Sequence, residues 1–127
     1  MALKTTLGAL PDEIFVGEDV AIPFDIDDEA TPAVPVNMAG YTLTFELTER
    51  RSPQVLITKT VGSGIAIGNS PAAPAGNGGT NARATVTIDD TDTDDLRPGT
   101  YSYVLRRTNA GLEKVLAYGS FILRKAP

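Results

Sequence analysis

The sequence contains neither cysteine nor histidine among its 127 residues. Without cysteine, the chain can form neither a disulfide nor a thiolate nucleophile. Without histidine, it also lacks the commonest general base and, together with cysteine, the usual ligands of zinc. The Ser-His and Cys-His pairs that activate a nucleophile in many hydrolases are therefore excluded.

Basic residues are scarce as well: 11 Lys and Arg stand against 16 Asp and Glu, for a net charge of −5. We expect no nucleic-acid partner, because phosphates are neutralised by clustered Lys and Arg. Tryptophan, the stacking platform of many carbohydrate binders, is absent. No apolar run approaches membrane-spanning length, and the start of the chain lacks the apolar core of a signal peptide. We expect a protein made in a cytoplasm, with no membrane partner.

What the chain does contain is a series of segments with period-2 alternation, which is typical of half-buried β-strands. The clearest is 41–48, which places Tyr41, Leu43, Phe45 and Leu47 on one face. Further strands are expected at 20–25, 55–60, 84–88, 100–108 and 112–123, and the stretches 13–16 and 65–67 are candidates for short additional strands. Pro23 cannot donate to a ladder, so it predicts an edge or a bulge in its strand. About seven strands, no convincing helix and punctuating turns predict one all-β sandwich domain over 1–127.

An acidic turn, Asp89–Asp95, runs into Leu96, Pro98, Gly99 and Tyr101, which have the spacing of a tyrosine corner. From that corner and the alternating strands we predict a core containing Tyr41, Leu43, Phe45, Val86, Ile88, Leu96, Tyr101, Tyr103 and Leu105. Alternate carboxylates in the turn could converge on Ca²⁺. An EF-hand loop, however, needs Gly and Glu where this chain has Asp95 and Tyr101. We favour a short helical turn with Asp and Thr side chains on free backbone N–H groups, and keep a weak Ca²⁺ site as the alternative.

No other pattern predicts chemistry. The carboxylates lie on turns, with no sign of the cleft that paired catalytic carboxylates need. The Gly-rich stretches lack the Lys and the helical context of phosphate-binding loops. We therefore expect no enzyme activity, no cofactor, no resident metal and no small-molecule substrate.

Residues 62–81 carry no charge and are rich in Gly, Ala and Pro. A loop this long inside a compact domain is uncommon and is usually functional or mobile. We predict a flexible loop over 62–82. It is either a tolerated insertion between two strands or a contact loop that a partner orders.

The last strand is apolar on both faces. One parity holds Val115, Ala117, Phe121 and Leu123, and the other holds Leu116, Tyr118 and Ile122. A two-layer sandwich buries only one face of a strand, so the other is expected to meet a neighbour. The candidate interface is Leu116, Tyr118 and Ile122, or the opposite set if the register is reversed.

Four phrases together resemble a known family: 17–26, 40–47, 84–103 and 119–123 are similar to the immunoglobulin-like domain of tailed-phage virion proteins, such as the N-terminal domain of phage baseplate upper proteins. The resemblance implies an antiparallel immunoglobulin-like β-sandwich and a non-enzymatic structural role. Such a domain would dock in several copies on a head, tail or baseplate of the virion, with other virion proteins and copies of itself as partners.

The chain departs from that family by ending at Pro127 without a coiled coil and by inserting the 62–81 segment. We therefore expect a small accessory or decoration protein located in the virion. The alternative is a module that binds a glycan or a host surface through its loops.

Overall fold

The computed structural model describes residues 3–7, 13–28, 30–49, 52 and 54–125, which form nine strands and one short helix. In chain order these are β1 (Leu3–Leu7), β2 (Glu13–Phe15), β3 (Val20–Asp28), β4 (Leu43–Glu49), β5 (Val55–Val61), β6 (Gly64–Gly68), β7 (Arg83–Ile88), α1 (Asp90–Thr93), β8 (Gly99–Arg107) and β9 (Lys114–Arg124). The predicted all-β class is confirmed. Within the described ranges, no helix is long or apolar enough to cross a membrane.

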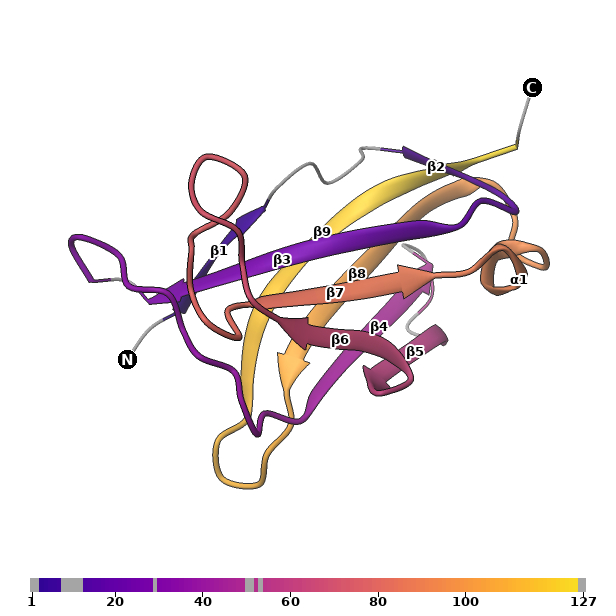
Figure 1. Cartoon of the computed structure of the whole chain (residues 1–127). Coiled ribbons are helices and arrows are strands. Elements are labelled where there is room, and N and C mark those ends of the chain that lie inside the picture. The colour runs from indigo at the N-terminus through magenta and orange to yellow at the C-terminus, as the bar shows by residue number, and fades with distance from the viewer. Residues whose placement is uncertain (1–2, 8–12, 29, 50–51, 53, 126–127) are drawn as a thin grey trace.

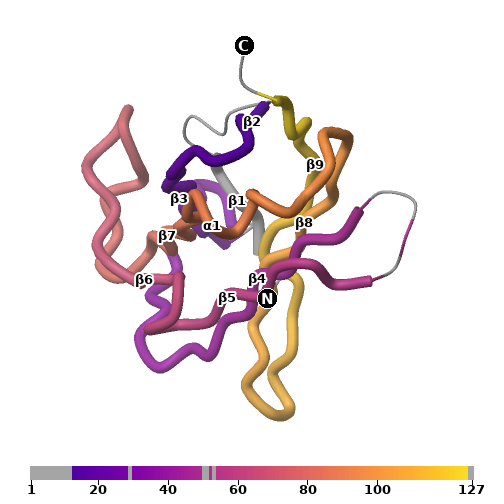
Figure 2. The backbone as a smooth tube through the Cα atoms, turned by 90° about the vertical axis from the view of Figure 1, so that its right-hand side faces the viewer, coloured from indigo at the N-terminus to yellow at the C-terminus, as the bar shows by residue number. Residues whose placement is uncertain are grey.

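The strands follow the order β1-β3-β7-β6-β5-β4-β8-β9-β2 in one strongly curled sheet. Figures 1 and 2 show its two halves as layers, with β3, β7 and β6 on one side and β4, β8 and β9 on the other. The rings of Phe24 in β3 and Tyr103 in β8 meet between the layers, with centroids 5.8 Å apart. Because β1 also contacts β9, the sheet is nearly closed.

The sheet is mixed rather than purely antiparallel, which corrects one expectation. β2 runs parallel to β9, and β5 runs parallel to β6 over the pairs Thr60–Gly64 and Val61–Ile65. Only Gly62 and Ser63 separate β5 from β6. Local alternation predicts that strands exist, but it carries no information about their relative direction.

The core follows the predicted alternation. Leu43, Phe45 and Leu47 of β4 are buried, and so are Tyr101, Tyr103 and Leu105 of β8. Val86 and Ile88 of β7 are also buried, while Tyr41 and Leu96 are partly buried against the same cluster. Strands β4, β7 and β8 therefore each have one face in a common interior, as a period of two requires.

Nine strands replace the predicted seven or so, partly because β1 has a weak sequence signal. Its five residues pair with Phe24–Asp28 of β3, so β3 is not an edge strand as Pro23 had suggested. The Ile26 N–H donates to Ala82 O on the β7 side. Since N–H directions alternate along a strand, the nitrogen of Pro23 faces the β1 side, and β1 has already ended there. Pro23 thus removes no hydrogen bond to β1.

Candidate functional site

The outer face of β9 carries the most exposed large side chains of any strand in the described chain. Tyr118 is 80% exposed, Val115 is 49% exposed and Ile122 is 40% exposed. Strand β9 pairs along its whole length with β8, which places Tyr118 opposite Val104 and Ile122 opposite Thr100. We call Val115, Tyr118 and Ile122 the β9 patch. Two of its members, Tyr118 and Ile122, were predicted as interface residues.

Leu116, the third predicted interface residue, is buried instead, with 4% of its surface exposed. The β8–β9 register shifts between Leu105 and Arg106, which pair with Ala117 and Val115 respectively. Leu116 is the extra residue of this bulge, so it turns inward with Ala117 while Val115 turns outward. A bulge reverses side-chain parity on one side of itself, which simple alternation cannot anticipate. Replacing Leu116 by Val115 corrects the predicted set.

Ion pairs flank the β9 patch at both ends. Arg106 lies opposite Val115, and its Nε is 3.7 Å from the Glu46 carboxylate on β4. At the other end, Arg124 pairs with Glu13 of β2. Both pairs are at the surface, where each contributes little to stability. The β9 patch is therefore an apolar area with one oppositely charged pair at each end.

The predicted corner residues lie together at the start of β8. The Tyr101 hydroxyl donates a hydrogen bond to the Arg97 carbonyl across the turn that holds Pro98 and Gly99. Burial raises the pKa of Tyr101, and the negative charge of Glu49 adds to this rise. The hydroxyl therefore stays protonated and acts as a donor at neutral pH.

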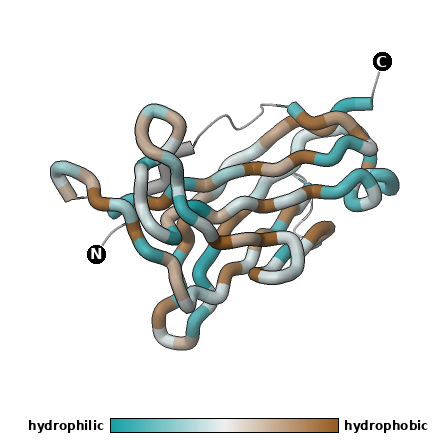
Figure 3. Tube along the Cα trace, in the orientation of Figure 1, coloured by the Kyte–Doolittle hydropathy of each residue, from teal (hydrophilic) through white to brown (hydrophobic). Residues whose placement is uncertain are grey.

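The acidic turn forms the short helix α1, as favoured over a Ca²⁺ loop, and Figure 3 shows it as a strongly hydrophilic end of the molecule. Its carboxylates have partners within the protein. Asp92 accepts from the Lys59 ammonium at 2.7 Å and from the Asp89 N–H at 2.7 Å. The Asp90 N–H donates to Asp19. In the described ranges no three acidic side chains converge as metal ligands.

The segment 69–81 lies on the outer side of the β3–β7–β6 layer, as Figure 2 shows. Its two arms are joined by Ser70 N–H to Gly79 O at 2.9 Å and Gly78 N–H to Pro71 O at 2.9 Å. The Asn77 amide reaches Asp27 Oδ1 at 2.9 Å, and the Asn77 N–H donates to the Ser70 hydroxyl at 2.8 Å. The segment therefore has defined contacts with β3. Its flexibility in solution stays a prediction.

Beneath this segment, the outer face of β3 buries charge. Asp25 is 1% exposed and receives two hydrogen bonds from Arg83, at 2.7 and 2.8 Å. The Arg83 bonds hold the pKa of Asp25 below its usual value, against the opposing effect of burial. Asp27 and Asp28, which sequence alternation had placed in a loop, belong to β3 and are buried too. Their burial depends on residues far away in sequence, so no local pattern could have indicated it.

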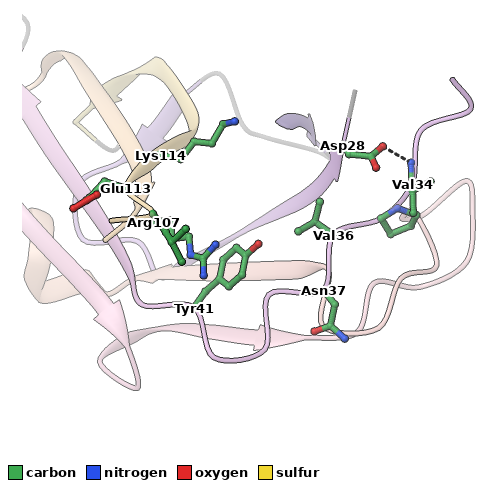
Figure 4. Close-up of a pocket in the computed structure, with 10 residues that line it drawn as sticks. Asp28, Val34, Val36, Asn37, Tyr41, Arg107, Glu113 and Lys114 are labelled. Atoms are coloured by element: carbon green, nitrogen blue, oxygen red, sulfur yellow. Dashed lines mark hydrogen bonds between the residues drawn. The ribbon is translucent and has the colours of Figure 1, made fainter. Parts of the chain in front are cut away.

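A pocket of about 580 Å³ opens between the segment after β3 and the β8–β9 connection, and sequence reasoning missed it (Figure 4). The Arg107 guanidinium lies 3.6 Å from the centroid of the Tyr41 ring. Its Nε donates to Asn109 Oδ1 at 2.8 Å, and the same oxygen accepts from the Thr42 N–H at 2.9 Å. The pocket thus joins two loops separated by more than half the chain. Arg107 and its neighbour Arg106 lie on opposite faces of β8, and no local sequence pattern links Arg107 to Tyr41.

Comparison with known proteins gives no family. No family model matches the chain, and neither does any curated protein. Solved structures that match the chain include a β-glucosidase from Listeria innocua in complex with glucose, with 12% identity and a TM-score of 0.45 over 96% of this chain. Another is a family 123 glycoside hydrolase from Clostridium perfringens, with 16% identity and a TM-score of 0.46 over 99% of this chain. The chain spans only 16% and 28% of those two proteins, and these likenesses carry no argument about activity.

Proposed function

We propose that this chain is a non-enzymatic structural domain of a tailed-phage virion, which docks in several copies on a head, tail or baseplate through the β9 patch. Two observations support this role: the resemblance of four sequence segments to the family, and the exposure of the outer face of β9. The partners would be other virion proteins and further copies of the chain, and the protein would reside in the virion.

We also propose the finer description of the fold, an immunoglobulin-like sandwich with a tyrosine corner. Its support is the strand order. The immunoglobulin arrangement has strands A, B, E and D in one sheet and C, F and G in the other. Here β1-β3-β7-β6 and β4-β8-β9 follow those two orders, with β5 and β2 added at the flanks. The hydrogen bond from the Tyr101 hydroxyl to the Arg97 carbonyl, at the start of the strand that would correspond to F, supports the proposed corner.

The observation that carries the functional proposal is the exposure of Tyr118. A large aromatic ring that is 80% exposed lies on the outer face of β9, which also carries the exposed β-branched residues Val115 and Ile122. Burying such a side chain is worth about 1.5–3 kcal/mol, so a few per copy stabilise an assembly that repeats by symmetry. Tyrosine is also enriched at the centre of protein interfaces.

Incorporation into virions tests the proposal. We expect Tyr118→Asp and Ile122→Asp to give folded protein that no longer incorporates, as measured by mass spectrometry of purified particles. Val61→Asp is the matched control, because Val61 is 43% exposed on β5 and lies outside the β9 patch. The proposal is wrong if the wild-type chain is absent from virions, or if the patch variants incorporate as well as the control does.

The second candidate, a module that binds a glycan or host surface through its loops, has the pocket of Figure 4 in its favour. Against a sugar ligand, the ring of Tyr41 has one face covered by Arg107 and offers less surface for stacking. A glycan array separates the two candidates. Saturable binding to one glycan class, lost in Arg107→Gln and kept in Tyr118→Asp, would favour this second function.

A further inference from the structure

We propose that the pocket between the segment after β3 and the β8–β9 connection is a binding site for a small organic carboxylate. The carboxylate would accept hydrogen bonds from Arg107 and from the Tyr41 hydroxyl, while the apolar part of the ligand lies against Val34 and Leu112. This site is separate from the β9 patch and does not depend on the proposed virion role.

The Arg107 guanidinium is held in place before any ligand arrives. It stacks on Tyr41 at 3.6 Å, and its Nε is fixed by Asn109 at 2.8 Å. Asn109 is itself anchored, because its oxygen accepts from the Thr42 N–H and its Nδ2 donates to Gly40 O at 3.3 Å. These bonds use the Nε–H and leave the terminal N–H groups of Arg107, which form no ion pair with the described residues. A preoriented guanidinium loses little entropy when it binds a planar carboxylate.

The Tyr41 hydroxyl supplies a second polar group. Figure 4 shows it pointing into the same pocket, on the side of Val36. None of the described residues forms a hydrogen bond with this hydroxyl. One donor from the segment before β4 and one from the end of β8 therefore line the same pocket, as expected of a site that fixes the orientation of a ligand.

The acidic groups of the lining are already engaged with backbone donors. Asp28 accepts from the Ala30 N–H at 3.1 Å and from the Val34 N–H at 2.8 Å. Glu113 accepts from the Gly111 N–H at 3.1 Å, and backbone N–H bonds lower the pKa of Glu113. In Figure 4 these two carboxylates lie at opposite ends of the pocket, with Arg107 and Tyr41 between them. Neither one neutralises Arg107, so the guanidinium remains available to an external anion.

The rest of the lining favours an apolar ligand body. Three aliphatic side chains line the pocket: Val34, Val36 and Leu112. Of these, Val34 is 52% exposed and Leu112 is 56% exposed. The volume of about 580 Å³ is within the range of small-molecule sites. A ligand with an aliphatic or aromatic body would cover the two exposed side chains.

The charge of the site indicates a monoanion. Arg107 is one available cation, and Lys114, the other cation of the lining, already has an interaction of its own. A phosphate dianion would be poorly matched to a single guanidinium in a chain of net charge −5. A carboxylate matches the planar fork of arginine in both charge and shape.

The test is a titration of the ¹⁵N- and methyl-labelled protein with benzoate, benzamide and inorganic phosphate, followed by NMR. We expect saturable shifts of Arg107 Nε–H and of the Val34 and Leu112 methyl groups with benzoate, with a Kd of about 1 mM. Benzamide and phosphate should bind at least roughly tenfold more weakly. Equal binding of benzamide would overturn the role of charge, and tighter binding of phosphate would overturn the choice of carboxylate. No saturation with benzoate would remove the site altogether.

Arg107→Gln should weaken benzoate binding roughly ten- to a hundredfold, since a charge-assisted hydrogen bond is lost. Arg106→Gln is the matched control, because Arg106 is the next residue on β8 and faces the other side. Should Arg107→Gln fail to fold, Arg107→Lys keeps the charge but loses the planar fork, and the expected loss is roughly tenfold. Equal effects at positions 106 and 107 would show nonspecific attraction and contradict the proposal.

A carboxylate beside an apolar group occurs both in free organic acids and at the C-terminus of a polypeptide. A second titration uses N-acetyl-Ala-Val with a free carboxylate and with an amidated end. Tighter binding of the free dipeptide than of benzoate supports the site with a peptide terminus as its source. Weaker binding supports it with a free acid as its source, and equal affinity of the amidated dipeptide would overturn it.

Discussion

The two outer faces of the molecule reverse the usual placement of polar and apolar side chains. On β3, the carboxylate-bearing Asp25 is 1% exposed, whereas on β9 the aromatic Tyr118 is 80% exposed. The first face is covered by the segment 69–81, whose Asn77 amide donates a hydrogen bond to Asp27 of β3. Whether an outward side chain is buried thus depends on whether a later segment covers the face, more than on the chemistry of the side chain. The outer face of β3 is already covered by another segment of the same chain, whereas the outer face of β9 is exposed and available for a partner.

Removing Arg83 should have the largest effect, because it leaves Asp25 buried without its counterion. Arg83→Ala is expected to lower the free energy of unfolding by about 3 kcal/mol or more, measured by urea denaturation. The matched control is Arg97→Ala, which breaks an exposed pair with Glu49 in which the Arg97 side chain is 83% exposed. That change should cost less than about 1 kcal/mol. Equal losses would contradict the contrast between a buried pair and an exposed one.

The same ion pair predicts a pH dependence. Because Arg83 lowers the pKa of Asp25 in the folded protein, Asp25 contributes stability above its unfolded pKa of about 3.9. That contribution is lost as the pH falls through the lowered folded pKa. The stability difference between wild type and Asp25→Asn should therefore be largest near pH 7 and shrink below about pH 4. A difference that stays constant from pH 7 to pH 2.5 would mean that the charge on Asp25 contributes nothing.

The substitution Asn77→Ala tests whether the segment 69–81 is held against the outer face of β3. This change removes the amide that bonds Asp27 at 2.9 Å and Ile26 O at 3.3 Å. The expected cost is about 1–2 kcal/mol, together with faster amide hydrogen exchange at Gly78 and Gly79. Asn37→Ala is the control, since the Asn37 side chain bonds only to the exposed Ala39 N–H. Fast exchange already in the wild type would support the predicted flexible loop and weaken the view of the segment as a fixed cover.

Tyr101→Phe measures how much one buried hydrogen bond, away from both of these faces, contributes to the free energy of unfolding. It removes the donor to the Arg97 carbonyl and changes nothing else. We expect a loss of about 0.5–1.5 kcal/mol in the free energy of unfolding. An unchanged denaturation midpoint would show that the hydrogen bond from Tyr101 to Arg97 does not stabilise the fold.

The smallest effect on stability is expected on the exposed face. Tyr118→Ala should change the free energy of unfolding by no more than about 0.5 kcal/mol, because the side chain makes few contacts within the monomer. Thermal and urea unfolding of the isolated chain measure this. A loss above 2 kcal/mol would show that Tyr118 stabilises the monomer, and it would undermine the proposed role of the β9 patch in assembly.

Much of the fold could be predicted from particular residues. The alternation Leu43, Phe45, Leu47 specified a strand and its buried face, and Tyr101, Tyr103 and Leu105 did the same for β8. Of the predicted interface residues, Tyr118 and Ile122 are exposed and Leu116 is buried, while their role in an interface stays a prediction. Leu116 is buried because of the bulge between Leu105 and Arg106, which changes the face of every residue on one side of it.

The sequence by itself determined where strands form, which of their faces are apolar and which chemistries are impossible, because those properties depend on residue type and on spacing of two or three positions. Only the tertiary structure decided the strand order, the parallel pairs and the burial of Asp25 by Arg83, which lies 58 residues away. It also decided that Tyr41, in the segment before β4, and Arg107, at the end of β8, share a pocket. Such contacts join segments that are distant along the chain. The residue pattern within one segment does not specify which distant segment will pack against that segment.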